Sequence, residues 1–202
     1  MHIPPPVYDG VSFVAPDSDA VRAFLANRTR VVAATGHRPD KFPARHTTHL
    51  TPLPASFTAR QRARDPFGVY TRDGFAVLVN LASQELRAMG ADAVVTGGAL
   101  GWDQVVAHAA LMRGLPLLIA VPFESQPLVW PDGPRRLWER QARQADVVVC
   151  VTPVLTLLTP AVGSVRNLDQ DRMWRAMQDR NVFMVSCAHE VLAGWNSTPG
   201  GT

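Results

Sequence analysis

Short aliphatic runs and longer amphipathic segments alternate along most of the chain. Arg30–Thr35 (RVVAAT) is an apolar run that ends at Gly36, which is typical of a buried parallel strand breaking into a turn. Gly74–Met89 places apolar residues at helical spacing and stops at Gly90, a common residue directly after a helix. The same reasoning predicts further strands at Ala93–Thr96, Leu117–Val121, Val147–Val151 and Val182–Val185, and further helices at Asp19–Ala26, Trp102–Arg113, Pro134–Gln144 and Leu168–Asp179.

This alternation predicts the fold class. Strands separated by helices form βαβ units, whose strands are parallel and whose crossovers are right-handed. We therefore expect an α/β fold, a Rossmann-like doubly wound parallel sheet with helices on both faces. Ligands of such sheets bind outside the carboxyl ends of the strands, so the residues that follow each strand are the first candidates for a site.

Two segments lack the alternation. Residues 1–17 are rich in proline and without a period, and we expect an extended arm there, followed by a short helix capped by Asp17 or Ser18. Residues 37–72 also have no period, and a long segment of this kind inside a compact domain is usually functional or mobile. The predicted organisation is an N-terminal arm with a short helix (residues 1–29) and one Rossmann-like domain (residues 30–202).

The composition is that of one folded domain. With 202 residues, 47% of them hydrophobic and 18% charged, the chain can bury a core, which excludes disorder throughout. Its longest apolar run, Leu115–Val121, is too short to cross a bilayer, and no signal peptide is visible. Cys150 and Cys187 form neither a disulfide framework nor a metal-binding pair. We expect a cytoplasmic protein without a membrane segment or a bound metal.

Arginine dominates the positive charge. Nineteen of the twenty basic residues are arginine and Lys41 is the remaining one, although the net charge is only +3. Guanidinium groups form planar, bidentate contacts with phosphate, so the chain is well supplied for phosphate binding, while a biased genomic composition also explains the excess. Because no basic helix is interleaved with aromatic residues, nucleic acid is not the expected partner.

The glycines of Gly97–Gly101 (GGALG) join a predicted strand to a predicted helix. Glycines at this position let the backbone approach a phosphate, and the start of the helix supplies free N–H groups and a positive dipole end. The spacing matches neither a dinucleotide fingerprint nor a P-loop, and a tight turn without a ligand fits it as well. Asp103, in the first helical turn, is suited to stabilise the helix dipole, to bind a ribose, or to act as an acid or base.

Two other strand ends carry polar groups. Thr35–Pro39 (TGHRP) brings a hydroxyl, a glycine and two potential cations to one place, which suits an anionic ligand but is also typical of a solvated turn. Pro122–Gln126 (PFESQ) adds a carboxylate and an amide after the strand at Leu117–Val121. The tryptophans Trp102, Trp130, Trp138 and Trp174 are interpreted as packing residues, any one of which could instead stack on a base.

Five blocks of residues then occur in a recognisable order: Thr35–Pro39, Gly97–Gln104, Pro122–Gln126, Met177–Val185 and Trp195–Thr202. In this order they resemble the YpsA-like proteins of phages and Gram-positive bacteria, within the SLOG superfamily. That superfamily also holds the LOG (Lonely Guy) nucleotide phosphoribohydrolases and the DNA-processing protein A domain. The resemblance spans about residues 30–202, and the arginine-rich composition would suit an actinobacterial or phage source.

The resemblance implies a Rossmann-like fold that binds a nucleotide or nucleotide-derived ligand at the strand ends. LOG enzymes carry a P-G-G-x-G-T-x-x-E motif whose glutamate takes part in glycosidic cleavage. Here Pro199–Thr202 matches only the start of that motif, and Ser186 stands where relatives usually have Asp. Both departures count against an enzyme. Without the helix that follows this motif in relatives, a patch of the sheet would be left uncovered, and we expect a second chain, as in a homodimer, or the N-terminal arm to cover it.

Three functions are therefore considered. The first is a sensor or adaptor that binds a nucleotide, with phosphate on the glycine amides and Asp103 on the ribose. The second is a hydrolase of a nucleoside monophosphate or an ADP-ribose-like metabolite, with Glu124 and Asp103 as catalytic carboxylates. The third is single-stranded DNA binding by the arginines of residues 45–72. The candidate ligand-binding residues, some from strand ends and some from the resemblance, are Thr35, Gly36, His37, Arg38, Gly97, Gly98, Ala99, Asp103, Gln126, Arg180, Asn181, Gly200, Gly201 and Thr202.

Overall fold

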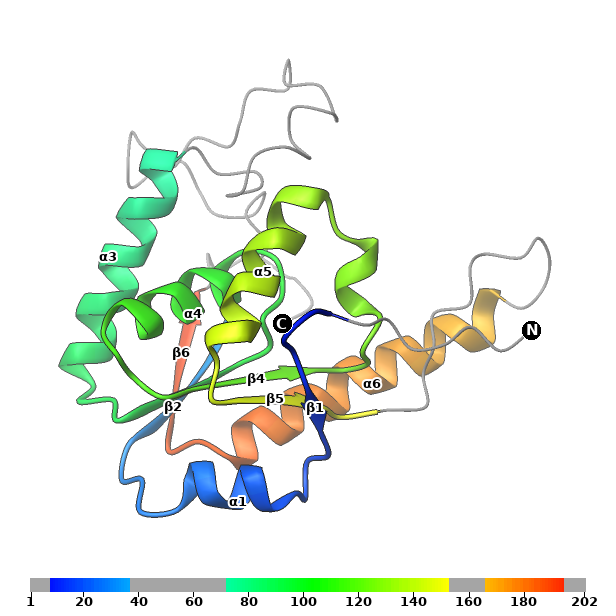
Figure 1. The fold of residues 1–202 in the computed structure, drawn as a ribbon, viewed down its shortest axis with the longest axis horizontal. Helices are drawn as coiled ribbons and strands as arrows, with labels where there is room; N and C mark the ends of the chain where they lie inside the picture. Colours follow the sequence, from blue (N-terminus) through cyan, green and yellow to red (C-terminus); the bar gives the residue numbers. More distant parts are fainter. Residues whose placement is uncertain (1–7, 37–71, 153–165, 195–202) are drawn as a thin grey trace.

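The computed structural model describes residues 8–36, 72–152 and 166–194, and within these ranges six parallel strands form one sheet in the order β1-β5-β4-β3-β2-β6 (Figure 1). The fold is therefore α/β and Rossmann-like, as predicted. The strands are β1 (Phe13–Val14), β2 (Val31–Gly36), β3 (Ala93–Thr96), β4 (Leu117–Val121), β5 (Val147–Cys150) and β6 (Glu190–Gly194). The helices are α1 (Asp19–Leu25), α3 (Arg72–Ala88), α4 (Trp102–Met112), the short 3₁₀ helix η2 (Gln126–Val129), α5 (Asp132–Gln144) and α6 (Arg166–Ser186).

The sheet is wound in two directions. From β2 the chain steps through α3, α4 and α5 to β3, β4 and β5, and α6 then returns it to β6 beside β2. Figure 1 shows α3, α4 and α5 on one side of the sheet and α1 and α6 on the other. Helices thus cover both faces, as the alternation of strands and helices predicted.

Neighbouring residues of each central strand enter two different cores. Val32 and Ile119 belong to the apolar cluster under α3, α4 and α5, whereas Val31 and Leu118 belong to the cluster under α1 and α6. Successive side chains of a strand point to opposite faces, so a strand covered on both faces must be apolar throughout. This explains why these strands appear in the sequence as continuous aliphatic runs.

The prediction of a strand at Val182–Val185 is wrong. These residues lie in α6, and the last strand is β6, at Glu190–Gly194. In α6, Ala176, Arg180 and Met184 are buried at intervals of four residues, while Val182 and Val185 are 68% and 56% exposed. Four apolar residues fit a strand or a helix equally well, and the helical interval of burial is a tertiary property that the apolar run did not reveal.

Strand β1 was not predicted, because it falls in the segment expected to be an arm. The strand is two residues long and both pair with β5, Phe13 with Val148 and Val14 with Val149. The ring centroid of Tyr8 lies 6.0 Å from that of Phe13 and 5.1 Å from that of Trp138 on α5. The strand is thus held by contacts with residues more than a hundred positions away. The following helix begins as predicted, with the Ser18 hydroxyl accepting a hydrogen bond from the N–H of Val21.

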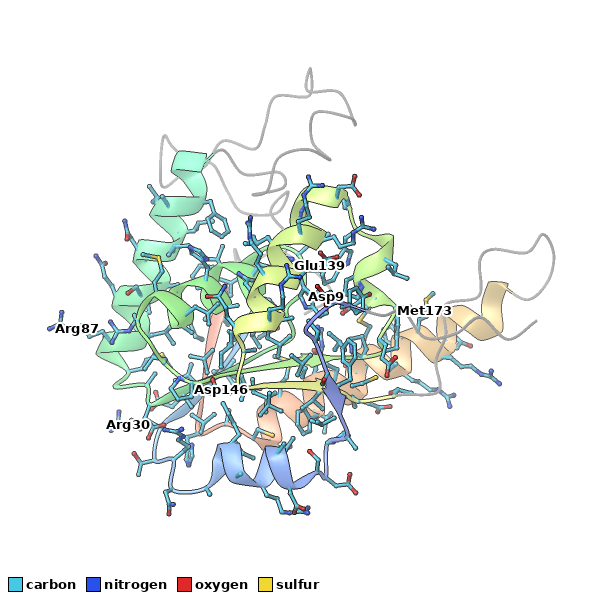
Figure 2. All side chains as sticks on the ribbon, viewed as in Figure 1. Asp9, Arg30, Arg87, Glu139, Asp146 and Met173 are labelled. Carbon is cyan, nitrogen blue, oxygen red and sulfur yellow. The ribbon has the colours of Figure 1, made fainter. Side chains whose placement is uncertain are left out.

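The amino ends of the strands are closed by the chain's own side chains. A carboxylate oxygen of Asp92 accepts from the N–H of Thr29 at 2.7 Å, one of Asp146 accepts from Leu117 at 2.9 Å, and Nδ1 of His189 accepts from Val31 at 3.1 Å. In Figure 2, Asp146 lies at this end of the sheet, away from Met173 on α6. These bonds satisfy backbone donors where the strands begin, so the carboxyl edge is the place to look for a ligand.

Candidate functional site

The turn between β3 and α4 is built on glycines that leave no room for side chains. A Cβ on Gly97 would lie 2.2 Å from Nη1 of Arg180, and one on Gly98 would lie 2.8 Å from Nε1 of Trp138. Gly98 and Gly101 also have φ angles of +60° and +102°, which favour glycine. The Thr96 hydroxyl accepts from the N–H of Gly98 at 3.3 Å, which fixes the start of the turn.

Gly98→Ala is expected to lower the free energy of unfolding by about 2–3 kcal/mol, because it combines a left-handed backbone with a clash against Trp138. Gly114→Ala is the matched control, since Gly114 has a similar φ of +65° but nothing within 4 Å of the added Cβ. The control should lose about 1 kcal/mol from backbone strain alone. Urea unfolding of both variants measures the difference, and equal losses would contradict the tight packing of this turn.

Asp103 is turned into the protein at the start of α4. It is 4% exposed, and its Oδ2 accepts from the N–H of Ala99 at 3.3 Å. Burial raises the pKa of Asp103 from 3.8 to about 6, against the opposing effects of Arg180 and of the N–H groups of Ala99, Asp103 and Gly97. The carboxylate thus serves as an internal acceptor for the amides of the glycine turn, and it holds a proton more readily than an exposed aspartate does.

Arg180 reaches this turn from α6, which covers the opposite face of the sheet. It is 8% exposed, its Nη1 donates to the carbonyl of Gly97 at 3.4 Å, and the same atom lies 4.0 Å from Oδ2 of Asp103. Its Nε donates to Oδ1 of Asn181 at 3.1 Å. Burial lowers the pKa of Arg180, with Asp103 opposing, but a guanidinium group remains charged in proteins. The structure therefore joins four of the candidate residues in one cluster, in which Gly97, Asp103 and Arg180 are buried and Asn181 is half-buried.

The end of β2 lies beside this cluster and is closely packed. Gly36 faces Trp102, whose Cβ would be 2.6 Å from a Cβ on the glycine. The indole N–H of Trp102 donates to the carbonyl of Leu192 on β6 at 3.2 Å. Trp102 thus fixes the first turn of α4 against β2 and β6, which agrees with its interpretation as a packing residue. Trp174, by contrast, is 65% exposed.

The end of β4 holds the other candidate carboxylate. Glu124 is half-buried, and its backbone carbonyl accepts from the Tyr8 hydroxyl at 3.0 Å. Burial is the main cause of the raised pKa of Tyr8 and of Cys150; the negative charge of Glu124 adds to it, in Tyr8 after the larger effect of Glu139. The groups that act most strongly on Asp103 are instead Arg180 and backbone amides. The charge of Glu124 is thus felt by Tyr8 and Cys150, and it is not among the groups that act on Asp103.

Gln126 follows Glu124 at the start of η2. It is 4% exposed, its Nε2 contacts the sulfur of Met177 at 3.4 Å, and its Oε1 is buried without a hydrogen-bond partner among the described residues. A buried amide oxygen left unpaired lowers stability, so Gln126 stands out as a polar group that packing does not explain. Thr35 and Gly36 lie at the end of β2, whereas His37, Arg38, Gly200, Gly201 and Thr202 lie outside the described residues.

Two contacts at the site were not predicted from the sequence: that of Tyr8 with the end of β4, and that of Trp138 with Gly98. A single aromatic residue in a proline-rich segment carries no periodic signal, so its contact with the end of β4 could not be expected. Trp138 was interpreted as one of several packing residues, but only the fold places its ring under Gly98. In the sequence, Trp138 is recognisable as a large apolar residue on the inner face of a helix. This pattern predicts that its side chain is buried, but not which residue it contacts.

Neither a known protein-family profile nor a curated protein sequence matches the chain. The resemblance to the YpsA-like proteins therefore stays a prediction. In the described part of the chain, no helix is long and apolar enough to cross a membrane, and no group of three or more His, Cys, Asp or Glu side chains is placed to hold a metal ion.

Proposed function

We propose that this protein binds a nucleotide or nucleotide-derived ligand at the carboxyl edge of the sheet and acts as a sensor or adaptor. The glycine turn before α4 carries the proposal. Gly97, Gly98 and Gly101 keep side chains away from the backbone there, while Ala99 and Leu100 are only half-buried. The 11-residue helix that follows directs its positive dipole end toward this turn, an arrangement that favours phosphate.

The charges around the turn support an anionic ligand. Arg180 adds a full positive charge beneath the turn, and Asp103 offsets it only while it is ionised. A phosphate or pyrophosphate group at the turn would gain from the positive charge of Arg180 and from the positive end of the α4 dipole.

The second candidate is hydrolysis of an N-glycosidic bond, which the raised pKa of Asp103 favours, because a general acid must hold a proton near neutral pH. Its weakness is that Glu124 is not among the groups that act on Asp103, so the site offers no evident pair of carboxylates. If Glu124→Gln and Asp103→Asn each kept full turnover of a cleaved ligand, this function would be excluded.

A thermal-shift screen with nucleoside phosphates, ADP-ribose and NAD tests both functions. A ligand at 100 times its Kd adds about 2.7 kcal/mol to the free energy of unfolding, which a melting curve detects readily. Chromatography of the ligand afterwards separates the alternatives. An intact ligand supports the binding protein, whereas free base with a ribose phosphate supports the hydrolase.

Ala99→Asp is expected to weaken binding of a ligand found in this screen by at least about tenfold, because it sets a negative charge beside the amides of the turn. Ala99 has no positive φ and is half-buried, so the fold should tolerate the change. Ala99→Asn has nearly the same shape without the charge and serves as the control. Titration calorimetry compares the two, and equal affinities would place the anionic group elsewhere.

A further inference from the structure

Arg180 connects the two helical layers across the carboxyl end of β3. Its helix, α6, packs with α1 on one face of the sheet, while Gly97 and Asp103 lead into α4 on the other. The side chains of Arg180 and Asp103 are only 10% and 5% exposed. Arg172 and Arg175 on the same helix are exposed. Arg180 is thus a buried cation directed at one turn, whereas these neighbours face solvent.

The turn is shaped to receive this guanidinium. Nη1 of Arg180 lies 2.2 Å from where a Cβ on Gly97 would be, so only glycine leaves space for it. The carbonyl of Gly97 and the carboxylate of Asp103 both lie near Nη1 of Arg180. The Asp103 carboxylate also accepts a hydrogen bond from the N–H of Ala99. Arg180 therefore acts on both ends of the turn, through one backbone group and one side chain.

We propose that Arg180 is a positioning residue, which holds the glycine turn in its binding shape and keeps Asp103 ionised, and does not itself carry the ligand's anionic group. The inference rests on the proposed function and changes the role of Arg180 from ligand contact to support. To bind a phosphate directly, Arg180 would have to leave a buried carboxylate without its counter-charge, which is strongly unfavourable.

Loss of the guanidinium has a defined consequence at Asp103. Arg180 is the charged group that acts on this carboxyl among the described residues, and its other neighbours are the N–H groups of Gly97, Ala99 and Asp103 itself. Without Arg180, burial acts unopposed by charge and the carboxyl binds its proton at higher pH. A protonated carboxyl is a weaker acceptor for the N–H of Ala99, so the turn loosens.

The experiment follows Asp103 without any ligand, by carbon-detected NMR of its carboxyl group from pH 4 to pH 9. The signal is assigned by its loss in Asp103→Asn. Arg180→Met keeps most of the side-chain volume and removes the charge, so we expect the titration midpoint of Asp103 to rise by at least about one pH unit. Arg172→Met makes the same change at an exposed position of α6 and should leave the midpoint in place.

Arg180→Lys separates charge from shape. It retains the cation but lacks the planar guanidinium, whose Nη1 meets Gly97 and Asp103 while its Nε meets Asn181, so the midpoint should stay within about half a pH unit of the wild type, while affinity for the screened nucleotide falls. An unchanged midpoint in Arg180→Met would overturn the inference, because a packing role moves no titration. If Arg180→Met does not fold, the midpoint of the lysine variant decides alone: a rise of more than about one pH unit despite the retained charge would overturn the inference. The midpoints need no ligand, so they stand apart from any failure of the proposed function.

Discussion

Trp138→Ala is expected to lower the free energy of unfolding by about 3–5 kcal/mol, the range for removing a buried aromatic side chain from a core. Trp138 is fully buried, and its ring centroid lies 5.1 Å from that of Tyr8 and 6.4 Å from that of Trp130. The same ring lies against Gly98. One substitution therefore opens a cavity in the core, removes the ring contact between Tyr8 and α5, and removes the side chain that packs against Gly98.

Trp138→Phe should lose much less, about 1–2 kcal/mol, because it keeps an aromatic ring in place. The indole N–H has no hydrogen-bond partner among the described residues, so its removal breaks no such bond there. Trp174→Ala, at a side chain that is 65% exposed, is the matched control and should change stability by less than about 0.5 kcal/mol. Urea unfolding provides all three values. Equal losses at positions 138 and 174 would contradict the packing described for α5.

Asp103→Asn is expected to remove a distinct part of the pH dependence of stability. The pKa of Asp103 is raised from 3.8 to about 6 by burial, so the folded state binds the proton more tightly than the unfolded state. The stabilisation from this carboxyl is fully present below about pH 4 and is lost as pH rises through about 6. A shift of this size corresponds to about 3 kcal/mol, and the asparagine variant has no such group to titrate.

The measurement is the free energy of unfolding of both chains from pH 4 to pH 7.5. The stability of the variant relative to wild type should rise by up to about 3 kcal/mol across this window. Asp171→Asn removes one exposed carboxylate of α6 and controls for the change in net charge. Parallel curves for wild type and Asp103→Asn would mean that burial does not disfavour the ionised carboxylate. A buried carboxylate that lowers the free energy of unfolding at neutral pH is typical of a residue that serves a functional site, because it does not stabilise the fold.

The apolar pattern predicted most of the sheet because its aliphatic runs coincide with strands that are buried on both faces. β2 and β4 are covered on both faces, and their continuous aliphatic runs already indicate that environment. The same argument identified the carboxyl edge and the glycine turn, since parallel strands bring the residues that follow them to one edge. It failed at Val182–Val185, where an apolar run of four residues fits α6 as well as a strand, and at β1, whose two paired residues depend on β5.

By itself the sequence determined the α/β class, the strands β2 to β5, and the placement of Gly97, Gly98 and Asp103 at the carboxyl edge. These follow from periodicity and from glycine's freedom of backbone conformation, which are local properties of the chain. Only the tertiary structure decided that Asp103 points inward, that Arg180 crosses from the other helical layer to meet it, and that the charge of Glu124 acts on Tyr8 and Cys150. The meeting of Arg180 with the glycine turn joins residues 83 positions apart, its geometry is set by how the helices pack on the sheet, and no local pattern encodes that packing.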